Sequence, residues 1–368
     1  MRKNHLFLLM ALAALMFSCK PDKPVNPSEF DIGSGLLVLN EGNFQYSNAS
    51  LSFYDIQADT VCNNLFYKVN DAPLGDVAES MALVDGKLYI VVNNSNYIYK
   101  VDANTMVCDT SKPFKLTDFY SPREIHFVAP DKAYVSDLMG TNLWIINPQE
   151  MKHTGTIEMG KTTEKMVQVG SELYVSNWSY YYIDHTSTES YNTVQVVDLN
   201  NDVKVAEIEV GKEPNSMVAD KNGHVWVLCE GRSYDDWGEN PTLWEIDPML
   251  KTATCQYEFK GPFEDDDEIK GTASMLKVNP AGDQLYMIYN NEVRRFDIGT
   301  LSLSESFCIV PEPQGLFYSL AVDPRTGDIY VTDAKNYMMN GTVYRYSFDG
   351  VLLASFEAGI IPNAMLFK

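Results

Sequence analysis

The chain has 368 residues, of which 45% are hydrophobic, and its formal net charge is −22 at pH 7. This length could hold two average domains, but closed β architectures commonly reach it as a single unit. The negative charge excludes a nucleic-acid-binding protein, because a phosphate backbone requires a basic surface. It also disfavours adsorption onto anionic lipid.

The first 18 residues have the pattern of a signal peptide. Arg2 and Lys3 form a positive start, and an apolar run follows from Leu6 to Leu15. Such a run matches the hydrophobic region of a secretory signal and is too short to span a bilayer as a helix. We therefore set residues 1–18 aside from the folded domain.

A cysteine follows the signal directly. The run Met16–Cys19 ends in a small residue and then Cys19, which resembles the lipobox of bacterial lipoproteins, where the cysteine becomes the lipidated first residue. Ordinary secretion remains the alternative, because Met16 and Phe17 fit that pattern loosely. Residues 19–30 are rich in proline and polar side chains and are predicted to form a flexible tether.

The other cysteines do not form a recognisable framework. They are odd in number, scattered along the chain, and contain no C-x-x-C pair: Cys62, Cys108, Cys229, Cys255 and Cys308. This arrangement argues against a disulfide scaffold and against a zinc site. We expect these cysteines to act as small hydrophobic residues in strands.

A short pattern recurs along the rest of the chain. In each copy a small or polar residue precedes an apolar one, and an aromatic residue beside an apolar one follows after eight to eleven residues. Six copies are centred on Met81 with Tyr89, Ile125 with Tyr134, Met166 with Tyr174, Met217 with Trp226, Met275 with Tyr286, and Leu320 with Tyr330. They are about 40–60 residues apart, and each is followed by further short apolar runs, which is the signature of a β-propeller blade of four strands. No convincing amphipathic helix appears after residue 30, so an α/β fold is not supported.

The two ends of the chain supply a seventh copy. The run Leu36–Asn40 reads as the second strand of a blade that lacks its innermost strand. The run Pro362–Phe367 matches that missing strand, since Pro362-Asn363-Ala364-Met365 resembles Pro214-Asn215-Ser216-Met217. We therefore predict an all-β, seven-bladed propeller over residues 31–368, closed by the C-terminal strand in the first blade, which removes open sheet edges.

One face of this propeller is predicted to bind a ligand. The loops before the inner strands and those between the second and third strands open on the same face, and they are rich in aromatic and Asn residues. Exposed rings with amide groups suit a large, flat, partly polar ligand, although the long loops could instead fold back and bury their own rings. The candidate binding residues are Asn40, Phe44, Tyr46, Asn93, Asn94, Arg123, Lys165, Trp178, Tyr180, Tyr181, Tyr182, Tyr191, Tyr234, Trp237, Tyr318 and Tyr337.

No pattern in the sequence predicts a metal site or catalysis. The acidic run 264–268 could hold Ca²⁺ through oxygen ligands, but it does not match an EF-hand, and a solvated acidic loop explains it as well. His126, His153 and His224 lack partners at metal-ligand spacing. The sequence contains no nucleophile elbow, P-loop or HExxH motif. We expect a protein that is not an enzyme.

The mature chain resembles a known group of proteins. The runs Leu39–Phe44, Asn48–Asp55, Leu74–Met81 and Tyr89–Ser95 are similar to the YncE-like propeller lipoproteins of Bacteroidetes. Within that group the likeness is greatest to the BtuG-type surface proteins, which capture cobalamin and pass it to a TonB-dependent, BtuB-like outer-membrane transporter. This resemblance implies a lipid-anchored protein of the outer membrane that faces the cell exterior.

The resemblance also implies the ligand. It makes cobalamin, or a related corrinoid, the transported ligand, and it implies no cofactor that acts as a catalyst. The loop residues alone are consistent with a corrinoid but do not select it. Two alternatives stay open: a propeller that binds another nutrient or a glycan with the same face, and an interaction scaffold of the cell envelope.

Overall fold

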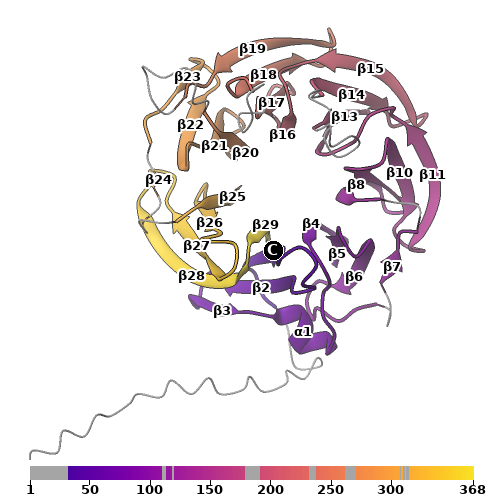
Figure 1. Ribbon diagram of the computed structural model, residues 1–368, viewed down its shortest axis with the longest axis vertical. Coiled ribbons are helices and arrows are strands. Elements are labelled where there is room, and N and C mark those ends of the chain that lie inside the picture. Colours follow the sequence, from indigo (N-terminus) through magenta and orange to yellow (C-terminus); the bar gives the residue numbers. More distant parts are fainter. Residues whose placement is uncertain are drawn as a thin grey trace, which may run out of the picture.

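Seven antiparallel blades, six of four strands and one of five, surround a central channel in the computed structural model (Figure 1). The structure describes residues 32–368 except for 110–112, 118–119, 179–190, 232–237, 262–270, 307, 310 and 312–314. The predicted tether, Cys19 and the signal peptide lie outside the described residues. Among those residues, no helix is both long and apolar enough to cross a membrane.

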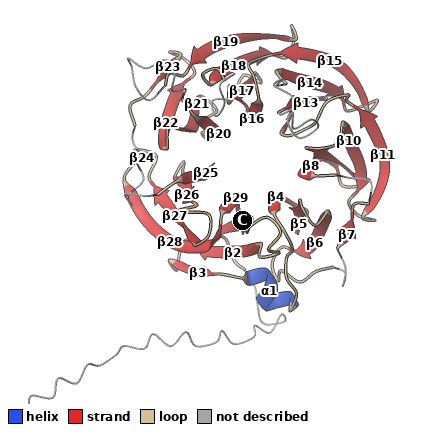
Figure 2. Cartoon of the chain, viewed as in Figure 1, coloured by secondary structure: helices blue, strands red, loops and turns tan. Residues whose placement is uncertain are grey.

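The strands follow the predicted order within each blade, from the channel outward (Figures 1 and 2). Blade 1 contains β29 (Pro362–Phe367), β1 (Leu36–Asn40), β2 (Ser50–Asp55) and β3 (Thr60–Cys62). Blade 2 contains β4 (Ala78–Val84), β5 (Lys87–Val92), β6 (Tyr97–Asp102) and β7 (Phe114–Lys115). Blade 3 contains β8 (Pro122–Ala129), β9 (Lys132–Asp137), β10 (Asn142–Asn147) and β11 (Lys152–Glu158). Blade 4 contains β12 (Met166–Val169), β13 (Glu172–Asn177), β14 (Thr193–Asp198) and β15 (Val203–Glu209).

The second half of the ring repeats this arrangement. Blade 5 contains β16 (Pro214–Ala219), β17 (Val225–Cys229), β18 (Thr242–Asp247) and β19 (Thr252–Glu258). Blade 6 contains β20 (Ala273–Val278), β21 (Gln284–Tyr289), β22 (Glu292–Asp297) and two short outer strands, β23 (Ser302–Leu303) and β24 (Cys308–Ile309), which both pair with β22. Blade 7 contains β25 (Phe317–Val322), β26 (Ile329–Asp333), β27 (Asn340–Tyr346) and β28 (Leu352–Ile360).

The predicted closure of the ring is confirmed. Strand β29 pairs antiparallel with β1, with Leu36 opposite Phe367 and Val38 opposite Met365. The C-terminal strand thereby becomes the innermost strand of blade 1, beside β4 and β25 in the centre of the ring (Figure 1). Both termini of the folded domain are tied into one sheet, so that β1 is paired along both of its edges.

The core lies between the blades rather than within one layer. Seven clusters of buried hydrophobic residues each join two neighbouring blades. A second strand such as β17 is therefore covered on both faces, and all of its residues are buried. This explains why these strands appear in the sequence as continuous apolar runs instead of an alternating pattern.

The Asp or Asn that ends the third strand of blades 1 to 6 has a local structural role. Asp102 Oδ1 accepts hydrogen bonds from the backbone N–H groups of Asn104 and Thr105, and Asp247 Oδ1 does the same for Met249 and Leu250. Such carboxylates cap the hairpin to the fourth strand, because Asp side chains readily bond to backbone groups two and three residues on.

Two local features differ from the sequence prediction. A six-residue helix, α1 (Leu65–Asn70), joins blades 1 and 2 and buries Leu65, Phe66 and Val69 (Figure 2); a segment this short gives no periodic pattern. In blade 6 the inner strand has a bulge, with Met275 at φ 61°. Lys277 therefore pairs with Tyr286. The pairing register of the repeat centred on Met275 is thus shifted by one residue relative to the other blades.

Candidate functional site

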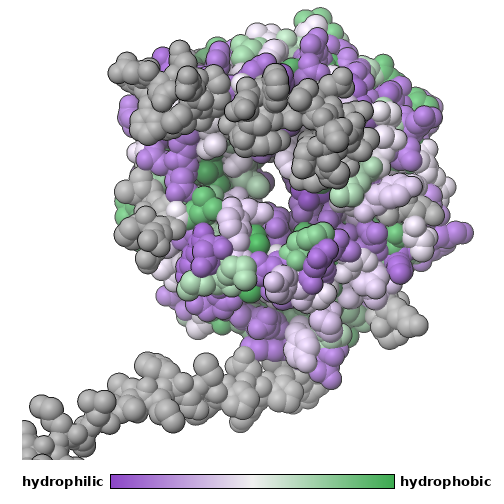
Figure 3. All heavy atoms as spheres, viewed as in Figure 1, coloured by the Kyte–Doolittle hydropathy of each residue, from purple (hydrophilic) through white to green (hydrophobic). Residues whose placement is uncertain are grey.

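The channel forms a cavity of about 540 Å³ that is lined by residues from all seven blades. The space-filling view shows its opening near the centre of the ring (Figure 3). The inner strands start near this opening, as the repeat predicts. Their first residues therefore face the channel, and these positions carry polar and ionisable side chains: Glu79, Arg123, Glu164, Asn215 and Tyr318.

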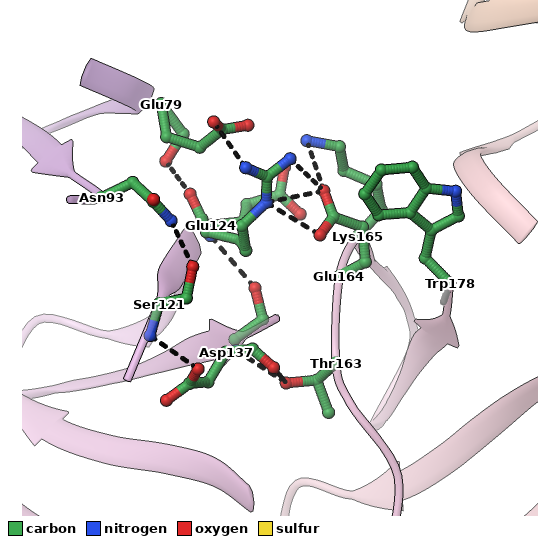
Figure 4. A network of polar contacts seen from close by, with 12 residues as sticks. Glu79, Asn93, Ser121, Glu124, Asp137, Thr163, Glu164, Lys165 and Trp178 are labelled. Carbon is green, nitrogen blue, oxygen red and sulfur yellow. Dashed lines mark hydrogen bonds and ion pairs between the residues drawn. The ribbon is translucent and has the colours of Figure 1, made fainter. Parts of the chain in front are cut away.

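Arg123 is the centre of an ion-pair network between blades 2, 3 and 4, whose partners Glu79 and Glu164 are labelled in Figure 4. Its Nε and Nη2 donate to the Glu164 carboxylate over 2.9–3.1 Å, and its Nη1 donates to Glu79 Oε2 at 2.7 Å. Lys165 Nζ lies 3.5 Å from Glu164 Oε1. A forked guanidinium suits this double contact, because it presents several donors in one plane.

The backbone around this network is held by hydrogen bonds between blades (Figure 4). Thr163, the residue before Glu164, accepts a hydrogen bond at Oγ1 from the Asp137 N–H at 2.8 Å. The Asp137 carboxylate accepts from the N–H of Ser121 at 2.9 Å, just before Arg123. The two segments that carry the ion pair are thereby fixed to the end of the same strand, β9.

The two carboxylates bound to Arg123 differ electrostatically. Burial opposes ionisation of Glu164, but the charges of Arg123 and Lys165 outweigh it and hold the pKa of Glu164 below its usual range. Burial raises the pKa of Glu79, and Arg123 offsets this only in part. Glu164 is thus the ionised partner of the arginine, and Glu79 is the one that takes up a proton more readily.

Glu41 is a second acid with a shifted pKa. It follows β1 and accepts hydrogen bonds from the Tyr318 hydroxyl at 3.0 and 3.1 Å. Burial and the nearby Glu79 raise the pKa of Glu41 to about 8. Near pH 7 this side chain is therefore mainly a neutral carboxylic acid, able to donate a hydrogen bond into the channel.

Glu230 has a similar environment in blade 5. Trp178 Nε1 donates to its Oε2 at 3.1 Å, and Asn215 Nδ2 donates to its Oε1. Burial raises the pKa of Glu230 to about 7. The channel wall therefore combines permanent charges around Arg123 with acids that change charge near neutral pH.

Exposed apolar side chains gather on the face where the channel opens. Among the predicted residues, Phe44 is 62% exposed, Tyr46 68% and Tyr337 41%. The Tyr337 ring lies edge-on to Tyr318, with 5.9 Å between ring centroids. The loops of this face also expose side chains that were not among the candidates: Tyr120, Met139, Met338 and Met339. We call this set of seven side chains the rim.

Three predicted Asn residues support the loops instead. Asn40 is completely buried, and its side chain bonds to Ser50, Ser52 and the Gly359 N–H. It joins blade 7 to blade 1 and is not accessible to a ligand. Asn93 donates to Ser121 Oγ and the Pro122 carbonyl, and Asn94 donates to Asp76 Oδ2. The three Asn residues lie on the predicted face, but their side-chain amides bond mainly to neighbouring loops and strands.

Some of the remaining candidates line the channel, and others lie outside the residues that the structure describes. Arg123, Lys165, Trp178 and Tyr318 line the channel. Tyr191 is half-buried, with Lys161 Nζ 5.6 Å from its ring centroid. The candidates Tyr180, Tyr181, Tyr182, Tyr234 and Trp237, together with the acidic run 264–268, lie outside the described residues.

Sequence reasoning missed most of the ionisable channel residues. Glu41, Glu79, Glu164, Glu230 and Lys277 were not among the candidates, although all of them line the cavity. The available signal was positional: Glu79 and Glu164 precede or flank the repeated inner-strand motif. The aromatic and Asn residues of the loops indicate the predicted ligand-binding face, whereas the channel residues are indicated only by their position beside the inner-strand motif.

One cluster on the opposite face has the composition of a metal site. Within the described residues, Asp220, His224 and Glu245 bring potential ligand atoms within 4.8 Å of one another, a grouping the sequence spacing did not reveal. Each is already engaged, since His224 Nδ1 lies 2.5 Å from Glu245 Oε1 and Asp220 accepts from the Trp226 indole. These bonds account for the cluster without an ion.

The chain belongs to a family defined by a domain of unknown function, DUF5074. The family model matches residues 34–361, which is nearly the whole propeller. A search of curated proteins finds no match to the sequence.

Solved structures confirm the propeller fold. The chain is similar to a quinonprotein alcohol dehydrogenase-like protein from Bacteroides thetaiotaomicron (17% identity, TM-score 0.64, 90% of this chain and 78% of that one). It is also similar to a protein from Lactobacillus plantarum (14%, TM-score 0.64, 91% and 100%). A third similar structure is an inactive virginiamycin B lyase from Staphylococcus aureus with quinupristin (11%, TM-score 0.56, 77% and 84%). At these identities the likeness concerns the fold alone.

Proposed function

We propose that this propeller is a non-catalytic binding protein that captures cobalamin, or a related corrinoid, on the rim at the mouth of its channel. The observation that carries the proposal is the rim itself, with Phe44, Tyr46 and Tyr337 largely exposed beside a polar cavity. Large apolar side chains grouped around a concave opening favour binding, because a ligand that covers them removes apolar surface from water.

The channel below the rim supports the same ligand class. A corrinoid has a broad ring and many peripheral amides, which require both donors and acceptors. The protonated Glu41 can donate, whereas Glu164 can only accept. A ring resting on the rim would place its polar periphery near such groups, which fix orientation in binding sites.

The proposal also includes transport of the bound ligand into the cell. The signal peptide and Cys19 support a lipid-anchored protein at the outer membrane that faces the exterior. The resemblance to BtuG-type proteins supports a TonB-dependent outer-membrane transporter as the partner that receives the ligand.

Calorimetry with cyanocobalamin tests the proposal on the mature chain. We expect saturable binding by the wild type. Truncating Phe44, Tyr46 or Tyr337 to Ala should weaken it by about tenfold or more each, because buried aromatic anchors typically contribute at least 1–2 kcal/mol. The matched control is Phe348→Ala, since Phe348 is 53% exposed on a hairpin of the opposite face; it should change affinity by less than about twofold.

The outcomes separate the alternatives. No measurable binding by the wild type would exclude cobalamin and favour another nutrient, a glycan or a protein partner. Tight binding that is unaffected by the three rim variants would keep the ligand but place it elsewhere. An equal loss in Phe348→Ala would show that the rim has no special role.

A further inference from the structure

Lys277 occupies an unusual position in the inner strand of blade 6. It pairs with Tyr286 across β20 and β21. The residue that pairs with the same aromatic position is apolar in blades 2, 4, 5 and 7 and is a histidine in blade 3: Ala82, Val167, Val218, Ala321 and His126. Of these residues only Lys277 lines the channel, and it lies next to the bulge at Met275.

The ammonium group of Lys277 stands apart from the polar groups that the structure describes. It forms no hydrogen bond and no ion pair with any residue that the structure describes. The other two channel cations are paired, since Arg123 contacts Glu79 and Glu164, and Lys165 also contacts Glu164. Lys277 is half-buried in the channel wall. Withdrawing a cation even partly from water without a partner is costly, and proteins normally pair such groups.

The nearby acids are already engaged. Glu124 Oε2 accepts the Met166 N–H at 2.7 Å. Glu230 accepts from Trp178 and Asn215, and Glu164 accepts from Arg123. Burial lowers the pKa of Lys277, the charge of Lys165 lowers it further, and Glu124 offsets these effects only in part. Lys165 thus acts on Lys277 more strongly than Glu124 does, and an added negative charge between the two lysines would relieve their repulsion.

We propose that the channel binds an oxyanion, a carboxylate or phosphate group, with Lys277 as its direct partner and Lys165 as the second cation of the site. The cavity of about 540 Å³ is large enough for a small free anion or for the anionic group of a larger ligand. Glu41 and Glu230 do not oppose this, because their raised pKa values reduce their negative charge near neutral pH. The site does not depend on the corrinoid proposed for the rim.

Calorimetry with sodium phosphate and with sodium acetate, against sodium chloride at matched ionic strength and pH 7, tests this site in the folded mature chain. The wild type should bind at least one of the two oxyanions saturably. Lys277→Met should weaken that binding by about 10- to 100-fold, because a hydrogen bond to a charged group contributes about 1.5–3 kcal/mol. Lys277→Arg should keep it within about threefold, and the control Lys212→Met, at a surface ion pair with Glu239, should leave it unchanged.

The melting temperature of Lys277→Met shows whether Lys277 already has a partner within the protein. In buffer without oxyanions, Lys277→Met should melt at the same or a higher temperature than the wild type, because it removes an unpaired charge. A clear fall would overturn the proposal by showing that Lys277 already has a partner within the protein. Equal anion binding by Lys277→Met, or no saturable binding of either anion by the wild type, would overturn it as well.

The same experiment distinguishes the possible sources of the anion. Tight binding of free phosphate or acetate indicates a small-anion site. Weak but saturable, Lys277-dependent binding indicates the anionic group of a larger ligand. Neither result involves cyanocobalamin or the rim variants, so this proposal and the proposed function fail separately.

Discussion

The two halves of the channel wall share one backbone arrangement and differ in how their charges are satisfied. We call blades 2–4 the paired half, because Arg123 and Lys165 there are neutralised by Glu79 and Glu164. We call blades 5–7 the open half, because Asn215 and Tyr318 stand there at the strand position of Glu79, and the single cation Lys277 has no partner among the described residues. The paired half stiffens the ring from within, whereas the open half leaves polar groups available to a ligand.

The difference shows what a repeated strand does and does not specify. Every inner strand brings its first residues to the channel, so the position of the side chains is set by the repeat. Whether such a side chain forms an ion pair depends on which residue the adjacent blade carries at the same level of the channel. The predictions below test this contrast.

The largest effect should come from opening the ring, because both halves depend on it. Deleting residues 362–368 removes β29 and exposes the edge of β1. We expect aggregation or loss of cooperative unfolding, because an unpaired inner edge and an opened core would both be exposed. Circular dichroism melting measures this, and a melt within a few degrees of the full chain would contradict the closure.

The next largest effect should come from the paired half. Arg123→Met leaves Glu79 and Glu164 buried without their cation, which should lower the free energy of unfolding by about 3–5 kcal/mol. Denaturant unfolding at pH 7 measures the loss. Adding Glu164→Gln should recover part of it, and the exposed pair at Lys212 provides the control, since Lys212→Met should cost less than about 1 kcal/mol.

Glu41 predicts a pH dependence with a definite sign. Its pKa in the folded chain is about 8, above the usual value of 4.5, so the folded state holds a proton that the unfolded state releases. This contribution to stability is complete below about pH 4.5 and is lost as the pH rises toward and through 8, with a slope of up to about 1.4 kcal/mol per pH unit for one proton. Glu41→Gln should therefore be less sensitive than the wild type to pH between 5 and 9.

Denaturant unfolding at pH 5, 7 and 9 gives the comparison. Glu305→Gln is a suitable control, because the Glu305 side chain is fully exposed. Identical pH profiles for Glu41→Gln and the wild type would contradict the assignment of a raised pKa to Glu41.

The smallest effect should come from a single hydroxyl in the open half. Ser216 Oγ accepts the Leu276 N–H at 3.0 Å and links blade 5 to blade 6. Ser216→Ala should cost about 1–3 kcal/mol, because it leaves a buried amide without a partner. Ser216→Thr keeps the hydroxyl and should recover much of this loss; if both variants were as stable as the wild type, the hydrogen bond would have no role in joining the blades.

The fold was predictable because its signals are local and repeated. The second strands are continuous apolar runs, and an Asp at the end of a third strand caps the hairpin that follows it, as Asp102 does. The match between Pro362–Phe367 and Pro214–Ala219 gave the closure, which β29 confirms. The helix α1 and the bulge at Met275 were not predicted, because each depends on packing at one place and not on the repeat.

The candidate site was predictable only in part. Exposed rings such as Phe44 and Tyr337 lie on the face that the loop pattern indicated. Asn40, of the same loops, is buried, because it bonds across a blade junction that joins residues more than 300 positions apart in the chain. Composition identifies which loops are polar or aromatic, but not which side chains other loops will cover.

The sequence by itself determined the class of fold, the number of blades, the way the ring closes and the face with aromatic loops, since each follows from short apolar patterns repeated along the chain. Only the tertiary structure decided which charges meet in the channel. Glu41 and Tyr318 are 277 residues apart, and their contact, like the isolation of Lys277, depends on distant blades converging around one axis. Burial at that axis then sets the protonation of each group, and no local pattern contains this information.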